Sequence, residues 1–315
     1  MTNFAEISVD TERFRADVVS GLSRPQKRIA AKYFYDAEGS RLFDRITELD
    51  EYYPTRVELG ILASHVDEMA ERCGPKCLLI ELGAGSLTKV RLLLDRLDRP
   101  AGFVPVDVSG EHLESAADQL KAEYPGLAVH PVCADFTAEF ALPIRAARRV
   151  VYFPGSTLGN FEPAEADALM RKVAKLVGPG GGFLIGVDLR KDPAVLDAAY
   201  NDRLGVTAAF NRNLLVRINR ELGADFEPES FKHRAFYNRV RSRIEMHLVS
   251  TLDQRVRIGE DEFAFRRGES IHTENSYKYD LGELGNRAAA CGLRTEAAWT
   301  DPNRYFGMLF LRADS

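Results

Sequence analysis

The amino-acid sequence predicts an α/β protein: a doubly wound, mostly parallel sheet with a second, smaller α+β domain. Two patterns support this fold class. Between residues 77 and 188, short apolar runs alternate with segments in which apolar residues recur at helical spacing, which is typical of a parallel sheet covered by helices on both faces. Between residues 244 and 265, apolar residues instead recur at every second position, which is typical of antiparallel hairpins.

The composition is that of an ordinary globular protein. Of 315 residues, 45% are hydrophobic and 28% are charged, and 42 Lys and Arg against 47 Asp and Glu give a net charge of −5. This balance leaves no broad basic surface for a phosphate backbone, so nucleic acid is not expected as a partner. No apolar run approaches the roughly 18 residues that cross a membrane, and residues 1–10 do not show the basic segment followed by an apolar segment that is typical of a signal peptide. We therefore expect a cytoplasmic protein that does not bind membranes. We also expect a monomer, although no sequence pattern determines the oligomeric state.

The four cysteines and six histidines form no recognisable disulfide or metal pattern. Only Cys73 and Cys77 are close in sequence, and no second pair completes a zinc site. None of the histidines stands at ligand spacing from cysteines or acids. The cysteines are therefore expected to be reduced thiols, no metal is implied, and His247 and His272 are interpreted as surface residues.

The N-terminal part of the chain is helical and aromatic. Apolar spacing predicts a helix over residues 11–22 that ends before Pro25. The stretch 33–56 is rich in aromatic and turn residues and is interpreted as partly loop, either a hydrophobic anchor or a pocket lid. From Pro54, helical spacing continues until Gly74 supplies a C-terminal stop.

The alternating region follows. The expected strands cover residues 77–82, 102–107, 128–133, 149–153 and 182–188. The expected helices cover residues 88–97, 111–123 and 163–177. In a doubly wound sheet the carboxyl ends of parallel strands share one crevice, so polar residues at these ends are candidates for a binding site.

The pattern changes after residue 190. Helical spacing extends over 196–222, hairpins are expected around the turn at 259–261, and two strand-like runs flank 301–303. We therefore predict two domains, each assembled from separated segments. The predicted cofactor-binding domain is 57–190 plus 281–315, and the predicted substrate-binding domain is 1–56 plus 191–280.

A glycine-rich turn is the strongest chemical signal. The string Glu81-Leu-Gly-Ala-Gly-Ser86 joins a predicted strand to a predicted helix, so a ligand can approach the backbone at the helix N-terminus. The dinucleotide-binding pattern requires glycine at position 88, where this chain has Thr88. A P-loop is excluded because no Gly-Lys-Ser/Thr is present. The acid before the glycines suits a ligand that carries an amine.

Two further acids end the next predicted strands. Asp107 lies at roughly the 20-residue distance at which such sheets place their ribose-binding acid, and Asp135 ends the following strand. Together Glu81, Gly83, Asp107 and Asp135 resemble the S-adenosylmethionine site of class I methyltransferases, which have a Rossmann-like fold.

Five longer strings make the resemblance more specific. They are Tyr33-Phe-Tyr-Asp-Ala-Glu-Gly-Ser40, Glu51-Tyr-Tyr-Pro-Thr-Arg56, Gly155-Ser-Thr-Leu-Gly-Asn160, Gly205-Val-Thr-Ala-Ala-Phe-Asn-Arg-Asn213 and Arg243-Ile-Glu-Met246. From about Gly21 to Arg312 the chain resembles the histidine Nα-methyltransferases of ergothioneine biosynthesis. The resemblance implies an enzyme that transfers three methyl groups from S-adenosylmethionine to the α-amine of L-histidine, through its mono- and dimethylated forms, to give hercynine.

The resemblance and the strand-end pattern together assign the site residues. The expected cofactor-binding residues are Gly83, Lys89, Asp107, Asp135 and Phe136. The expected substrate-binding residues are Tyr52, Asn160, Tyr200, Met246, Glu274 and Ser276. Glu274 and Ser276 are two apart in a predicted strand, so both side chains are expected to face the imidazole nitrogens. Asn160 follows a strand, and its amide can donate to a carboxylate and accept from an amine.

Methyl transfer from a sulfonium requires alignment and exclusion of water rather than a strong base. Asn160 with Tyr52 or Tyr35 is expected to position the amine, while solvent takes the proton. Two alternatives stay open: the same chemistry on another amino acid such as tryptophan, because the imidazole contacts rest on two residues, and a non-catalytic nucleotide-binding protein that keeps the sheet. Thr88 disfavours a nicotinamide-dependent oxidoreductase.

Overall fold

The computed structural model describes residues 11–85, 87–108 and 110–314. These residues form two compact units, and the chain passes between them three times. The larger unit comprises Pro54–Lys191 and the residues from Tyr277 onward, and the smaller unit comprises the residues up to Tyr53 and Asp192–Ser276. The crossings follow residues 53, 191 and 276, and the assignment of the two units to cofactor and substrate stays a prediction.

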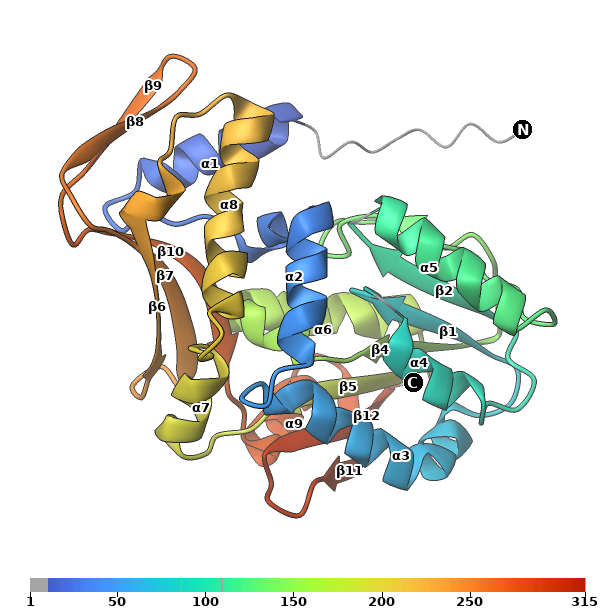
Figure 1. Cartoon of the computed structure of the whole chain (residues 1–315). Coiled ribbons are helices and arrows are strands. Elements are labelled where there is room, and N and C mark those ends of the chain that lie inside the picture. Colours follow the sequence, from blue (N-terminus) through green and yellow to red (C-terminus); the bar gives the residue numbers. More distant parts are fainter. Residues whose placement is uncertain (1–10, 86, 109, 315) are drawn as a thin grey trace, which may run out of the picture. The chain divides into compact units, whose positions relative to one another are not determined.

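The larger unit is built on a seven-stranded sheet with the order β11-β12-β5-β4-β1-β2-β3 (Figure 1). Its parallel strands are β1 (Cys77–Leu82), β2 (Gly102–Asp107), β3 (Val132–Cys133), β4 (Arg148–Phe153) and β5 (Gly182–Asp188). The hairpin of β11 (Leu293–Thr300) and β12 (Phe306–Ala313) joins β5 in antiparallel fashion. The predicted fold class is confirmed, and so is the closing hairpin.

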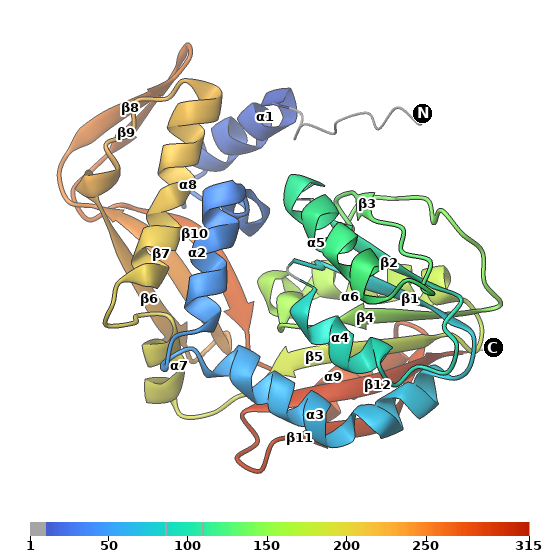
Figure 2. The same cartoon turned by 45° about the vertical axis from the view of Figure 1, so that its right-hand side comes forward.

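Helices cover both faces of this sheet (Figure 2). One face packs against α3 (Tyr53–Cys73), α4 (Thr88–Leu94) and α5 (Gly110–Glu123), and the other against α6 (Pro163–Val177) and α9 (Leu281–Ala289). Successive strand residues enter opposite cores: Leu79 belongs to the first core, and Leu78 and Ile80 belong to the second. This period of two explains why these strands read as continuous apolar runs. No helix in the described part of the chain is long and apolar enough to cross a membrane.

Two elements of the larger unit differ from the expectation. The strand expected over 128–133 is reduced to the two residues of β3, because Pro131 has no N–H to donate to a ladder, and Val129 keeps only an isolated bridge to Phe103. Helix α9 is not among the expected elements, since its two glycines weaken the helical signal. Asp280 caps its N-terminus, because the Asp280 carboxylate accepts hydrogen bonds from the backbone N–H groups of Gly282 and Glu283.

The smaller unit has a three-stranded antiparallel sheet and a separate hairpin. The sheet has the order β10-β7-β6 and consists of β6 (Phe231–Asn238), β7 (Arg243–Ser250) and β10 (Ser270–Tyr277). The hairpin consists of β8 (Gln254–Ile258) and β9 (Asp261–Phe265). The helices are α1 (Thr11–Leu22), α2 (Ala37–Thr47), α7 (Pro193–Ala199) and α8 (Val206–Leu222), and α8 packs on the sheet (Figure 1).

Three expectations for the smaller unit need correction. Residues 37–47 are helical rather than loop, because the Asp36 side chain caps α2 by accepting the Gly39 N–H at 2.7 Å. The helix expected over 196–222 is two helices, since Gly205 has φ +70° and the Asp202 carboxylate accepts the first N–H groups of α8. Strand β6 is an additional element that the sequence pattern does not predict.

A buried cluster of three charged side chains lies at the carboxyl end of β5. The Asp188 carboxylate contacts the Lys191 ammonium at 2.6 Å and the Lys278 ammonium at 2.7 Å, and all three side chains are at most 5% exposed. Burial opposes ionisation of Asp188, but the two ammonium groups outweigh it and lower the pKa of this carboxyl. Burial lowers the pKa of Lys191 to about 8. Both lysines lie next to chain crossings, so one carboxylate anchors two of the three connections to the smaller unit.

We expect Asp188→Asn to lower the free energy of unfolding by about 3–5 kcal/mol, because it leaves two buried ammonium groups without a counter-charge. Urea unfolding followed by circular dichroism measures this loss. The matched control is Glu283→Gln, which breaks the exposed pair of Glu283 with Arg190 and should cost less than about 1 kcal/mol. Equal losses in the two variants would contradict the anchoring role of Asp188.

Candidate active site

The glycine-rich turn follows β1 in the larger unit. Gly83 and Gly85 have φ values of +67° and +51°, a region that residues with a side chain rarely adopt. The Gly85 N–H donates to the Asp107 carboxylate at 3.2 Å. A Cβ atom on Gly85 would meet nothing within 4 Å, and one on Gly83 would meet only the Phe136 ring at 3.6 Å. The turn therefore leaves room for a ligand beside its backbone. Ser86, the last residue of the string, lies outside the described residues.

The other strand-end residues lie next to this turn. Asp135 follows β3, and its carboxylate accepts the Thr137 N–H at 2.9 Å. The Phe136 ring stands edge-on to Phe153, with 5.5 Å between ring centroids. The structure thus gathers the predicted Gly83, Asp107, Asp135 and Phe136 at neighbouring strand ends, and their contact with a cofactor stays a prediction.

Lys89, in the first turn of α4, forms an ion pair with the fully buried carboxylate of Glu58 on α3. The two Glu58 oxygens also lie 2.9 and 3.0 Å from the Gly155 nitrogen, which donates to them. Glu58 therefore ties the start of α4 to the turn after β4. Sequence reasoning missed Glu58, although a carboxylate one turn before Leu62 on the apolar stripe of α3 was a usable signal.

Two buried polar atoms in this region have no hydrogen-bond partner among the described residues: one carboxylate oxygen of Glu81 and the Tyr152 hydroxyl. The two residues are paired in the register of β1 and β4. Burial raises the pKa of both groups well above their usual values. A buried group without a partner is costly unless a ligand or water satisfies it, so these two oxygens are candidates for contact with a ligand or a water molecule.

The smaller unit contains a separate small cavity. Its lining residues are Phe43, Ile46, Tyr52, Ala199, Tyr200, Thr207, Phe210, Met246 and Glu274. Four of the predicted substrate-binding residues therefore line one cavity: Tyr52 before α3, Tyr200 after α7, Met246 on β7 and Glu274 on β10. The cavity holds about 20 Å³, little more than one water molecule, so an amino acid enters only if lining side chains shift.

Tyr200 connects the predicted substrate residues to one another. Its hydroxyl donates to the Ser276 hydroxyl oxygen at 2.8 Å, in a buried position. Its ring stands edge-on to Tyr52, with 6.2 Å between ring centroids. Its backbone carbonyl lies 2.8 Å from Nε2 of His233, a histidine whose pKa is lowered by burial. Glu274 lines the cavity together with Tyr200, and Ser276 accepts the Tyr200 hydroxyl; that both face an imidazole stays a prediction.

Tyr35 does not line the cavity, but it packs behind two residues that do. Its ring stands edge-on to Phe43 and Phe210, at centroid distances of 5.7 and 5.9 Å. Phe210 belongs to the string 205–213, whose polar residues hold the unit together. Asn211 accepts the Thr273 hydroxyl at 2.8 Å, and the Asn213 amide donates to Asp36 at 2.8 Å.

Asn160 belongs to the larger unit. It ends a short 3₁₀ helix (Thr157–Asn160) that follows β4 and is half-buried. The preceding Ser156 has φ +59°, and its hydroxyl oxygen accepts the Asp188 N–H at 2.9 Å. The Leu158 carbonyl accepts the Tyr279 hydroxyl at 3.1 Å. The turn is therefore fixed from both ends, and the contact of Asn160 with substrate stays a prediction.

The surface position predicted for His247 is wrong. His247 is not a surface residue but is 8% exposed, because it lies on the central strand of the three-stranded sheet. His272 is half-buried, and its ring stacks on that of His247 with 4.7 Å between centroids. Glu245 lies 3.3 Å from His247, so two histidines and an acid do cluster. Glu245 and His247 are two residues apart in a predicted strand, so the sequence already places both side chains on the same face.

Comparison with known proteins agrees with this arrangement. A family model described as "Histidine-specific methyltransferase, SAM-dependent" matches residues 14–313. The chain belongs to this family. The expected resemblance is confirmed, and S-adenosylmethionine is confirmed as the cofactor class of this methyltransferase family. A non-catalytic nucleotide-binding protein is accordingly rejected.

Individual relatives align with this chain over most of its length. The histidine N-alpha-methyltransferase of Mycolicibacterium smegmatis is 41% identical over 98% of this chain and 97% of its own. That of Mycobacterium tuberculosis is 43% identical over 93% of both chains. A crystal structure of an S-adenosylmethionine-dependent methyltransferase from Clostridium acetobutylicum is similar in fold, with a TM-score of 0.50 and 11% identity over 88% of this chain and 98% of that chain.

We expect Asp107→Ala to weaken binding of S-adenosylmethionine by about 10- to 150-fold, because a charge-assisted hydrogen bond contributes about 1.5–3 kcal/mol. Calorimetric titration measures the affinity. The control is Asp118→Ala on the exposed side of α5, where Asp118 forms a surface ion pair with Lys121, and its affinity should match that of the wild type. Unchanged affinity in Asp107→Ala would remove this carboxylate from the cofactor site.

Proposed function

We propose that this methyltransferase transfers three methyl groups from S-adenosylmethionine to the α-amine of L-histidine, through mono- and dimethylhistidine, to give hercynine for ergothioneine biosynthesis. The observation that carries the proposal is the cavity of the smaller unit, where Tyr52, Tyr200 and Glu274 meet. The relatives named histidine N-alpha-methyltransferase support it. So does the "Ergothioneine biosynthesis protein 1" of Neurospora crassa, 30% identical over 95% of this chain but only 34% of its own length.

The cofactor is assigned to the strand ends of the larger unit. Gly83 leaves the backbone accessible, Asp107 and Asp135 supply carboxylates for hydroxyl groups, and Phe136 supplies an apolar surface. Lys89 acts through Glu58, which holds the loop in place. When bound, S-adenosylmethionine supplies a methyl group on a positively charged sulfur, which leaves as a neutral thioether.

The substrate is assigned to the cavity of the smaller unit. Glu274 accepts an imidazole N–H, the hydroxyls of Ser276 and Tyr200 offer a donor and acceptors, and Met246 forms an apolar wall. Asn160, with Tyr52 or Tyr35, positions the amine so that its lone pair faces the methyl group. An ammonium has no lone pair, so a proton leaves to solvent before each transfer, and no side chain needs to act as a strong base.

Product analysis tests the proposal directly. L-Histidine incubated with the enzyme and S-adenosylmethionine should yield products with one, two and three added methyl groups on the α-nitrogen, as read by mass spectrometry. Tryptophan, tyrosine and phenylalanine, incubated in parallel, should yield little product. Methylation of tryptophan in preference to histidine, or no methylation of any amino acid, would overturn the proposal. Gel filtration and cell fractionation test the accompanying expectation of a monomeric, cytoplasmic enzyme.

We expect Glu274→Ala to weaken L-histidine binding by about 10- to 150-fold, the equivalent of about 1.5–3 kcal/mol for a hydrogen bond to a charged group. Binding of phenylalanine should change little or improve, because the apolar wall at Met246 remains. Calorimetric titration with both amino acids measures the difference. Glu262→Ala, at an exposed position of β9 in the same unit, is the control. Equal loss for histidine and phenylalanine would show that Glu274 does not bind the imidazole.

A further inference from the structure

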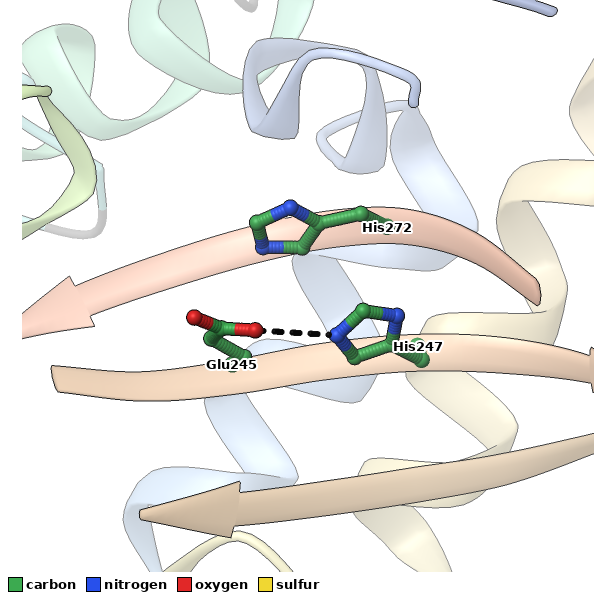
Figure 3. A group of neighbouring side chains, drawn as sticks. All are labelled: Glu245, His247 and His272. Atoms are coloured by element: carbon green, nitrogen blue, oxygen red, sulfur yellow. Dashed lines mark hydrogen bonds and ion pairs between the residues drawn. The ribbon is translucent and has the colours of Figure 1, made fainter. Parts of the chain in front are cut away.

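Three side chains of the smaller unit lie together without any part in methyl transfer. Glu245 and His247 are neighbours on the same face of β7, and His272 comes from β10 beside it (Figure 3). One ligand-type atom from each residue lies within 4.8 Å of the other two. Glu245 and His247 are buried and His272 is half-buried. We propose that Glu245, His247 and His272 bind a divalent transition-metal cation of the zinc class.

One of the three separations between ligand atoms already matches such a cation, and the other two lie within 4.8 Å. The Glu245 carboxylate oxygen lies 3.3 Å from Nε2 of His247. Zinc bonds of about 2.0–2.1 Å in tetrahedral geometry place neighbouring ligand atoms about 3.3–3.4 Å apart. Two histidines and one carboxylate are also a ligand set that zinc uses when a fourth position is left for water or another donor.

The ring nitrogen of His247 and the carboxylate oxygen of Glu245 that face away from the cluster form hydrogen bonds with other residues. Nδ1 of His247 lies 3.1 Å from the Ser270 hydroxyl. The second Glu245 oxygen accepts hydrogen bonds from Arg243 at 2.8 Å and from Asn238 at 3.0 Å. Such contacts fix the ring and carboxylate orientations that a metal needs. The positive charge of Arg243 opposes a cation, so the site favours moderate rather than tight binding.

The His272 ring has to rearrange before it can bind the ion. Nε2 of His272 lies 3.0 Å from the Glu274 carbonyl. For His272 to bind through Nε2, its proton moves to Nδ1. Because the two rings are within 11° of parallel, His272 must also tilt to point its lone pair at a shared ion.

Calorimetric titration of Zn²⁺ into the untagged, chelator-treated full chain tests the proposal. We expect one site with micromolar affinity, loss of binding by at least about 10-fold in both His247→Gln and His272→Gln, and an intermediate loss in Ser270→Ala, since removing an outer contact typically costs 10- to 100-fold. His130→Gln and Cys133→Ser, at residues outside the cluster, are the controls and should bind like the wild type. Circular dichroism of each metal-free variant establishes that it is folded.

Absorption of the Co²⁺-loaded protein provides a second readout. The wild type should show the intense visible bands of four-coordinate Co²⁺, and His272→Gln should lose them, even if His247→Gln fails to fold. No zinc binding tighter than millimolar, or zinc binding that both histidine variants retain, would overturn the proposal. Failure of the histidine methylation experiment would not bear on it, because none of the three ligands is assigned to substrate or cofactor.

Discussion

The anchoring of two chain crossings by one buried carboxylate is the constraint on which the two-unit organisation depends. Asp188 ends β5, and its carboxylate forms ion pairs with Lys191 and Lys278. Lys191 is the last residue before the chain leaves the larger unit, and Lys278 lies just after the chain returns. Backbone hydrogen bonds join the same two segments: the Tyr279 N–H donates to the Asp188 carbonyl at 2.8 Å, and the Arg190 N–H donates to the Tyr279 carbonyl at 3.0 Å. Two of the three connections to the smaller unit therefore start from one rigid point beside the strand ends of the larger unit.

Much of the larger unit is predictable because its signals are local. A strand buried on both faces is a short apolar run, and a residue that follows such a run lies at the carboxyl edge of the sheet. This reasoning is enough to locate Asp107 and Asp135 from the sequence. It does not single out Glu58 or Asp188, although Asp188 ends a strand in the same way. Their importance comes from partners distant in sequence, Lys89 for the one and Lys278 for the other, and a single sequence does not show which distant residues meet.

The smaller unit is harder to predict for the same reason. Its cavity combines α2, the segment around Tyr200 and two strands of the sheet, so no short window of sequence contains the site. The family resemblance nevertheless points to four residues that the structure gathers at one cavity, Tyr52, Tyr200, Met246 and Glu274, and their contact with substrate stays a prediction. The surface position predicted for His247 is wrong because its neighbour His272 lies on another strand. Burial of a polar residue in a sheet depends on what covers that face, which alternation alone does not reveal.

The position of β12 has a consequence for biosynthesis of the protein. This strand lies between β11 and β5, and all but one of its eight residues are buried. It is nevertheless translated long after β5, with the whole of the second segment of the smaller unit between them. Until it arrives, the nascent chain carries an unpaired, apolar strand edge that can pair with another chain. Ribosome stalling between residues 188 and 306 should therefore produce aggregation-prone fragments that depend on chaperones.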